Sequence, residues 1–173
     1  ANIISNFLNI MPSITTAGDT RYGVAIVNPP VGWRVANREV AKPVMAALLN
    51  DEPVSIVNKT SNSINIDWLS DCKFSLSGNS AKKIIITHWR FTEKSTDLVL
   101  AAGVLAVGIG CERGVSSEGI LNFVTLVLKR FKLNKYAIAC IATIDIKEDE
   151  RAIIDLANLW EVPLRLFDAP ILE

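Results

Sequence analysis

The stretch Val107-Gly108-Ile109-Gly110-Cys111-Glu112-Arg113-Gly114 decides the fold of this chain. The apolar run before it, Leu98 to Ala106, predicts a buried strand, and the amphipathic run after it, Ser116 to Lys132, predicts a helix. Glycines at such a junction let backbone N–H groups approach a ligand above the helix start, and the helix dipole favours an anion there. Arg113 adds a cationic side chain. We interpret residues 108–114, the glycine turn, as the floor of a site for a carboxylated ligand.

Hydrophobic periodicity defines the rest of the second half. After the turn, apolar residues recur at helical spacing: Ile120, Phe123, Val124, Val127, Leu128 and Phe131. Tyr136 to Ile144 predicts a second strand, the stripe from Ile153 to Trp160 a second helix, and Leu164 to Phe167 a third strand. Because crossovers between parallel strands are right-handed, this β-α-β-α-β order predicts a parallel sheet, which we expect in a three-layer unit.

Both loops that follow the first two strands of this unit, Gly110 to Ser116 and Thr143 to Lys147, leave the carboxyl ends of parallel strands. Ligands of open α/β sheets usually bind at that edge. If the two strands are neighbours, one ligand can be faced by Glu112, Arg113, Thr143, Asp145 and Lys147.

Asp145 is followed three residues later by Glu148, a spacing close to a capping box. We therefore expect Asp145 to be the N-cap of the next helix. Whether its carboxylate also faces the site is left open, since residues at this position often do both.

The first half is less regular. Arg38 to Leu49 predicts a helix, with Asn37 as its N-cap and Pro43 in its first turn or at a kink. Short strands are predicted over Val24 to Val27, Val54 to Val57, Ile64 to Leu69, Cys72 to Leu76 and Lys83 to Thr87. The polar stretch Arg90 to Thr96 predicts a linker. We thus expect an α/β protein of two small α/β lobes, residues 1–95 and 96–173.

Composition narrows the classes of function. Eighteen basic and eighteen acidic residues cancel, which argues against nucleic acid or an anionic membrane as a partner. No apolar run reaches the roughly 18 residues of a membrane span, and the first residues lack the basic region of a signal peptide. Three cysteines without paired spacing indicate reduced thiols rather than a disulfide framework or a zinc site. We expect a cytoplasmic protein.

Several motifs have alternative interpretations. The glycine turn is one residue too long for a dinucleotide fingerprint and lacks the Gly-Lys-Ser/Thr of a P-loop, so its glycines can also serve a tight turn alone. Cys111 lies where a thiol can become a nucleophile, although such a residue is more often a packing group. Thr15, Thr16 and Asp19 either cap a turn or line a cleft.

Several segments are similar to one family. Gly108-Ile109-Gly110-Cys111-Glu112-Arg113-Gly114 resembles the Gly-Ile-Gly-Cys-Arg-Arg-Gly segment of the cobalamin biosynthesis protein G family, the cobalt-precorrin-5A hydrolases. Ile141 to Lys147, with Glu150, resembles that family's Ala-Thr-x-Asp-x-Lys-x-x-Glu segment, and Thr15 to Asp19 its Thr-Thr-Ala-Thr-Asp segment. Glu112 stands in place of an arginine, and Gly18 in place of a threonine.

The resemblance implies that residues 1–95 correspond to the family's central domain and residues 96–173 to an incomplete C-terminal domain. It implies an anaerobic-pathway hydrolase that opens the ring A δ-lactone of cobalt-precorrin-5A and releases acetaldehyde to give cobalt-precorrin-5B. Cobalt would arrive with this corrinoid substrate, so we expect neither a cofactor nor a protein metal site. A cleft between the lobes would suit the flat macrocycle.

Lactone hydrolysis needs an activated water and a stabilised oxyanion. The candidate catalytic residues are Asp145, Glu118 and Glu112, with Asp19 as a further base from the other lobe. The candidate substrate-binding residues are Gly108, Gly110, Cys111, Arg113, Gly114, Thr143, Lys147, Thr15, Thr16 and Asp19. Two other classes stay open: a non-catalytic corrinoid carrier, and a regulatory domain that binds a small anion or nucleotide. Other cobalamin-pathway enzymes and a homodimer are left open as partners.

Overall fold

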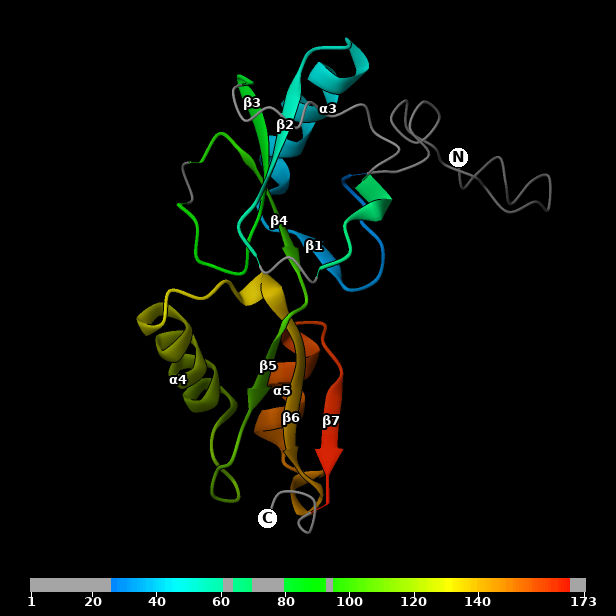
Figure 1. Cartoon of the computed structure of the whole chain (residues 1–173). Coiled ribbons are helices and arrows are strands. Elements are labelled where there is room, and N and C mark those ends of the chain that lie inside the picture. The colour runs from blue at the N-terminus through cyan, green and yellow to red at the C-terminus, as the bar shows by residue number, and fades with distance from the viewer. Residues whose placement is uncertain (1–25, 61–63, 70–79, 93–94, 169–173) are drawn as a thin grey trace, which may run out of the picture.

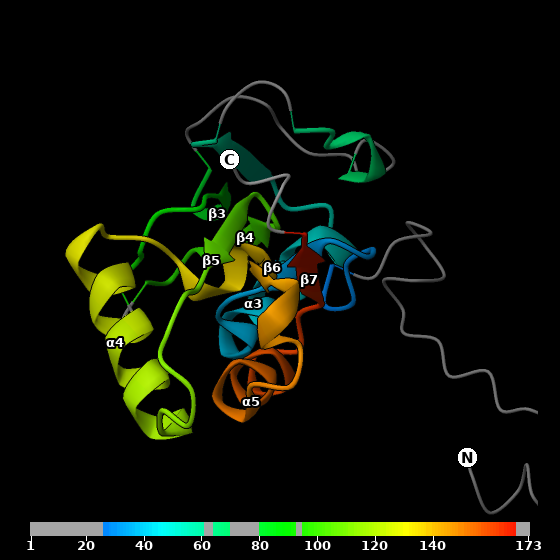
Figure 2. The ribbon, with the colours of Figure 1, turned by 90° about the horizontal axis from the view of Figure 1, so that it is seen from below.

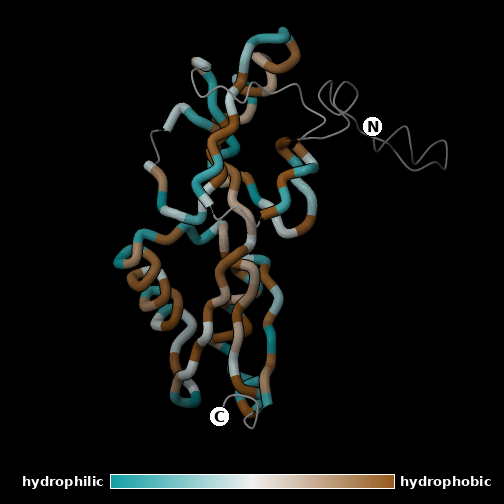
Figure 3. The backbone as a smooth tube through the Cα atoms, viewed as in Figure 1, coloured by the Kyte–Doolittle hydropathy of each residue, from teal (hydrophilic) through white to brown (hydrophobic). Residues whose placement is uncertain are grey.

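Two β-sheets organise the described part of the chain, one above the other in Figure 1. The computed structural model describes residues 26–60, 64–69, 80–92 and 95–168. The first sheet has the strand order β1-β4-β3-β2 and the second the order β5-β6-β7. Most positions along these strands are apolar (Figure 3), so each sheet can bury at least one face. The predicted α/β fold class is confirmed.

The first sheet is mixed. Its strands are β1 (Trp33–Val35), β2 (Val54–Asn58), β3 (Lys82–Ile86) and β4 (Leu98–Ala102). β2, β3 and β4 run parallel, and β1 pairs antiparallel with β4. Every residue of β4 is buried, as expected for a continuously apolar strand in the middle of a sheet. The strands predicted from Val54 and Lys83 are confirmed as β2 and β3.

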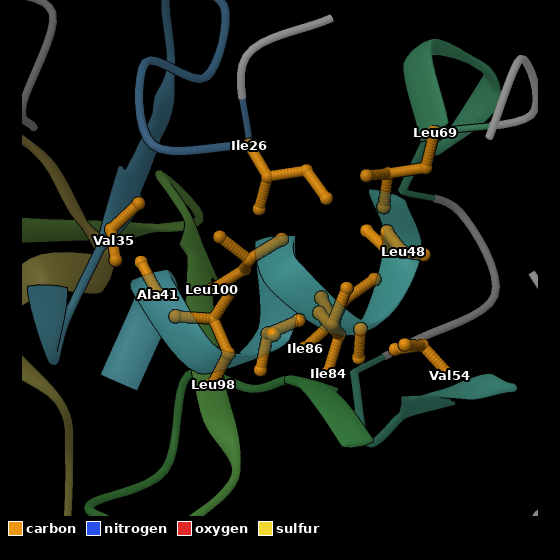
Figure 4. Packing of buried hydrophobic residues seen from close by; sticks show 12 residues of the cluster. Ile26, Val35, Ala41, Leu48, Val54, Leu69, Ile84, Ile86, Leu98 and Leu100 are labelled. Carbon is orange, nitrogen blue, oxygen red and sulfur yellow. The ribbon is translucent and has the colours of Figure 1, made fainter. Parts of the chain in front are cut away.

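One helix covers the core of this sheet. A 3-10 turn, η1 (Arg38–Val40), leads into α3 (Ala41–Leu49), and Pro43 lies in the first turn as predicted. Buried aliphatic side chains from α3 and the strands meet in the first core (Figure 4). The strand predicted over residues 64–69 is wrong, because Asp67–Leu69 form the 3-10 turn η2, which buries Leu69 in the same core.

Asn37 does not cap the helix as predicted, because its side chain makes no capping hydrogen bond. It is buried, and its Nδ2 donates to the Asp97 carbonyl at 2.9 Å. The N–H of Val99 donates to Asn37 Oδ1 at 2.8 Å. The amide therefore pairs backbone groups at the start of β4, which helps to satisfy buried polar atoms there.

The second lobe follows the predicted β-α-β-α-β order. Its elements are β5 (Leu105–Gly108), α4 (Ser117–Arg130), η3 (Lys135–Ala137), β6 (Ile138–Ile144), η4 (Asp145–Lys147), α5 (Arg151–Leu159) and β7 (Leu164–Phe167). All three strands are parallel. Ser116 caps α4, since its Oγ accepts a hydrogen bond from the Gly119 N–H at 3.0 Å.

The predicted three-layer arrangement of this lobe is wrong. Both right-handed crossovers advance in the same direction along the order β5-β6-β7, which places both helices on one face. α4 and α5 contact each other and share one core with β6, which includes Ile120, Ile141, Ile153 and Leu156. The view along the strands in Figure 2 shows both helices on the same side of the sheet. Within the described residues, the lobe has two layers.

The apolar run Leu98 to Ala106 is not one strand. It divides at Gly103 into β4 of the first sheet and β5 of the second. At Gly103 a Cβ would lie 3.3 Å from the Cα and Cβ of Ala139 and from the Gly32 carbonyl oxygen. The chain therefore passes from one lobe to the other at a point where the Cβ of a larger residue would be crowded. The change of sheet falls after Ala102, whereas the predicted division at 95/96 stays a prediction.

Some sequence predictions fall outside the described residues. These are the strand over residues 72–76 and the site residues Thr15, Thr16 and Asp19. Of the strand predicted over 24–27, only Ile26 and Val27 are described, and they lie in a turn.

Candidate functional site

The two βα loops of the second lobe meet at one edge of its sheet, as the sequence predicts. β5 and β6 are parallel neighbours, with Gly108 paired with Ala142. The glycine turn follows β5 and η4 follows β6, so both lie at the lower end of the lobe in Figure 1. We call this end the carboxyl edge.

Arg113 links the two loops. Its Nη1 donates to Asp149 Oδ1 at 2.8 Å and its Nη2 to the Ile146 carbonyl at 2.6 Å. Both charged side chains are more than half exposed. The hydrogen bond and the charge of Asp149 raise the pKa of Arg113, and the hydrogen bond from Arg113 lowers the pKa of Asp149. In this structure the guanidinium thus contacts a neighbouring loop of the same chain.

A carboxylate of the chain lies at the glycine turn. The Gly114 N–H donates to Glu150 at 3.2 Å from Oε1 and 3.4 Å from Oε2. The Glu150 side chain is only 3% exposed, and Lys147 Nζ lies 4.0 Å from its Oε2. Gly114 has φ +74°, a left-handed conformation that glycine adopts without strain. The Gly114 N–H is therefore taken by a carboxylate of the chain itself, Glu150, and the ligand site expected at the turn stays a prediction.

Glu150 is the residue that reasoning from local patterns missed. Only the family resemblance pointed to it, because a glutamate just before a helix is usually a solvated residue of the first turn. Glu150 is buried at the N-cap position of α5 because of how the loops pack in the folded chain, which no local sequence pattern predicts. The available signal was topological: because β5 and β6 are parallel neighbours, the loop after β6, which carries Glu148 and Glu150, must meet the glycine turn.

Asp145 is not the N-cap of α5. That helix begins at Arg151, six residues later, with Glu150 at the N-cap position. Asp145 instead opens η4, is half-buried, and its Oδ1 accepts a hydrogen bond from the Ile146 N–H at 2.7 Å. Its position at the end of β6 keeps it at the carboxyl edge.

The other predicted site residues differ in burial. Thr143 is buried, and its hydroxyl donates to the Ile109 carbonyl at 2.8 Å, which joins β6 to the glycine turn. Glu112 and Glu118 are exposed, and Cys111 is half-buried. The carboxyl edge thus brings together Asp145 and Lys147 with the glycine turn, while Thr143 supports the turn from below.

Two hollows adjoin the turn. One, of about 270 Å³, lies between the turn and α4 and is lined by Gly108, Gly110, Cys111, Val115, Phe123 and Val127, among others. The other, of about 340 Å³, is lined by Gly108, Gly110, Ala142, Thr143, Ile144 and Phe167, among others. Gly108 and Gly110 line both hollows, and a Cβ on either would meet no atom within 4 Å. The turn is accessible, with mostly apolar walls.

The expected cleft between the lobes exists, but the glycine turn does not line it. This cleft, of about 650 Å³, includes Lys135 and Tyr136, before β6, and Trp160 and Glu161, before β7. Those residues precede the amino ends of the parallel strands, whereas the glycine turn follows a carboxyl end. The two places therefore lie at opposite ends of the second lobe.

The described residues contain neither a cluster of metal ligands nor a membrane-spanning helix. Within the described ranges, His, Cys, Asp and Glu side chains form no group of three or more that could hold a metal ion. Across the same ranges, no helix has the length and apolar character to cross a membrane.

Comparisons with known proteins find two sequence similarities. The family model described as "Cobalamin synthesis G C-terminus" matches residues 105–173, which contain the glycine turn and the loop after β6. A cobalt-precorrin-5A hydrolase from Priestia megaterium is 26% identical over 174 residues, covering 89% of this chain and 46% of that protein.

A solved structure gives a weaker likeness. It is a cobalamin biosynthesis protein G homolog from Sulfolobus solfataricus, with a TM-score of 0.36 and 22% identity over 98% of this chain and 49% of that chain. The chain spans about half the length of the relatives it matches. The sequence matches confirm the resemblance to the cobalamin biosynthesis protein G family, whose C-terminal model covers the second lobe of this chain.

Proposed function

We propose that this chain acts in cobalamin biosynthesis by hydrolytic opening of the ring A δ-lactone of cobalt-precorrin-5A. Acetaldehyde leaves and cobalt-precorrin-5B is the product. The observation that carries the proposal is the meeting of the glycine turn, Asp145 and Lys147 at one accessible edge of a parallel sheet. The hydrolase from Priestia megaterium, which carries this activity in its name, supports it.

The chemistry assigns a separate role to each group. Asp145 acts as the general base. Its Oδ1 accepts the Ile146 N–H, while its other carboxylate oxygen makes no hydrogen bond within the described residues and can accept a proton from water. The water oxygen bonds to the lactone carbonyl carbon, its proton passes to Asp145, and the ring C–O bond breaks as Asp145 returns the proton to the departing oxygen. The hydroxyl so formed then loses its proton while the carbon–carbon bond to the macrocycle breaks. The two-carbon fragment leaves as acetaldehyde, and the macrocycle keeps the electron pair and takes up a proton. N–H groups of the glycine turn stabilise the oxyanion. Cobalt enters and leaves as part of the corrinoid.

Substrate carboxylates compete with those of the chain. Arg113 binds a peripheral acetate or propionate group by exchanging Asp149 for it, since both partners of that pair are exposed. Lys147, held near Glu150, offers a second cation at the same edge. Glu150 stays in place, because a buried carboxylate cannot leave its hydrogen bonds without a large cost.

An anaerobic assay with cobalt-precorrin-5A tests this function, with acetaldehyde as the readout. Asp145→Asn is expected to slow its release by about 100-fold or more, the usual contribution of a general base. Glu112→Gln and Glu118→Gln test the other candidate bases. Glu52→Gln is the matched control, an exposed acid of the first lobe, and should retain the wild-type rate. Equal rates for Asp145→Asn and wild type would exclude this base.

A corrinoid carrier is the second candidate function. It is favoured by the mostly apolar walls of the two hollows beside the glycine turn, which can contact a macrocycle but, among the described lining residues, include no acid or histidine to activate water. A carrier would bind the corrinoid tightly and release no acetaldehyde. Binding measured by absorbance, beside the acetaldehyde assay, separates the two functions.

A further inference from the structure

The cleft between the lobes has no role in the reaction proposed at the carboxyl edge. Its volume is about 650 Å³, within the range of small-molecule sites. It is lined by Asn28, Pro29, Trp33, Arg34, Val35, Arg38, Lys135, Tyr136, Leu159, Trp160 and Glu161. This lining combines basic and aromatic side chains from both lobes.

Basic side chains outnumber acidic ones in this lining. Among the described lining residues, the bases are Arg34, Arg38 and Lys135, and the one acid is Glu161. The guanidinium of Arg34 donates to the carbonyls of Trp160 at 2.7 Å and Glu161 at 2.5 Å, so it holds the C-terminal end of α5 against the first lobe.

The two other cations differ from Arg34. Arg38 and Lys135 are exposed, and within the described residues neither forms an ion pair with a carboxylate. Lys135 Nζ lies 5.1 Å from the centre of the Tyr136 ring. These two cations are therefore available to an anionic ligand.

The aromatic side chains supply flat apolar surface. Trp33, Tyr136 and Trp160 are each half-buried, so part of each ring remains exposed. The ring of Trp33 is held edge-on by Trp68, with centroids 5.2 Å apart and planes at 66°. Partly exposed aromatic rings that line a cleft can stack with a conjugated ligand.

We propose that this cleft binds a flat conjugated ligand that carries at least two anionic groups. The aromatic side chains contact its ring system, and Arg38 and Lys135 bind its anionic groups. Both a polycarboxylated tetrapyrrole and a nucleotide have this chemistry. The site is independent of the reaction proposed at the carboxyl edge, and either proposal can fail alone.

Titration of the full chain tests the site, with uroporphyrin as the carboxylated macrocycle and AMP as the nucleotide. Quenching of tryptophan fluorescence reports binding, and added salt should weaken it. Arg38→Ala/Lys135→Ala is expected to weaken binding by about tenfold, as the loss of two exposed charge contacts implies. Arg38→Lys/Lys135→Arg keeps both charges and should bind within about threefold of wild type.

The matched control is Lys129→Ala/Arg130→Ala, which removes the same charge from two exposed residues in the last turn of α4. It should bind as wild type does, and circular dichroism verifies that all variants fold. The probe whose binding is weakened by Arg38→Ala/Lys135→Ala shows whether the ligand is a carboxylated macrocycle or a nucleotide. The proposal is overturned if neither probe binds, or if binding survives Arg38→Ala/Lys135→Ala. Loss of binding in Arg113→Ala alone would place the ligand at the carboxyl edge instead.

Discussion

At the scale of single residues, the carboxyl edge is a set of paired charges. Arg113 is paired with Asp149, and Glu150 with the Gly114 N–H and Lys147. The sequence predicts a cation and exposed amides at this turn, and both are present. It could not predict their partners, because a run of acidic residues looks the same whether it is solvated or, like Glu150, buried.

Opposite effects are predicted for the two partners of the exposed pair. Arg113→Ala removes a ligand for substrate carboxylates and should weaken corrinoid binding markedly. Asp149→Ala removes the competitor and should strengthen it, by up to about fivefold, since exposed ion pairs contribute at most about 1 kcal/mol. Absorbance titration measures both affinities. If both variants bind more weakly, the pair serves only to hold the loops together.

The same pair predicts a pH dependence. Its hydrogen bond lowers the pKa of Asp149 below the ordinary value of 3.8, so the pair is fully formed above that pH and is lost as the pH falls through the lowered pKa. Carboxyl NMR shifts should show Asp149 titrating below pH 3.8 in wild type and closer to 3.8 in Arg113→Ala. An unchanged titration in the variant would contradict the pairing in solution.

A buried amide supports the first lobe. Asn37→Ala leaves the Val99 N–H and the Asp97 carbonyl without their side-chain partner, so unfolding free energy should fall by about 1–3 kcal/mol. Asn158→Ala on the exposed side of α5 is the matched control and should change it by less than about 0.5 kcal/mol. Urea denaturation measures both, and equal values would disprove the role of Asn37.

At the scale of elements, helical periodicity was the most reliable signal. It predicted α4 within two residues at its C-terminal end, but Phe123 within the helix and Phe131 at its C-cap, both part of the stripe, are exposed. Apolar runs were less informative. The run from Leu98 to Ala106 has no internal break in hydropathy, so its division between two sheets depends on packing around Gly103, which no local pattern encodes.

A pair of glycine substitutions tests that packing. Gly103→Ala places a methyl group 3.3 Å from atoms of Ala139 and from the Gly32 carbonyl, and should lower unfolding free energy by about 1–3 kcal/mol. Gly108→Ala meets no atom within 4 Å and should be neutral or stabilising. Thermal unfolding of both variants measures this difference, and equal stability would contradict the close approach of the lobes.

At the scale of the whole molecule, two sheets with separate cores are joined by a few polar contacts. Arg34 donates across the junction, and the Asn134 N–H donates to the His88 carbonyl at 2.8 Å. The sequence predicted two lobes and a cleft between them. It could not place the glycine turn at the far end of the second lobe, because the direction of a sheet relative to a neighbouring lobe is set by tertiary packing.

If the carboxyl edge of the second sheet binds the corrinoid, as proposed, the bound corrinoid should shield the amides of that edge from solvent. Amide hydrogen exchange of the chain, measured with and without cobalt-precorrin-5B, is the decisive experiment. We expect slower exchange at residues 109–116 and 143–149 when the corrinoid is bound. Unchanged exchange in both segments, with slowing confined to the cleft residues or to none, would contradict binding at the carboxyl edge.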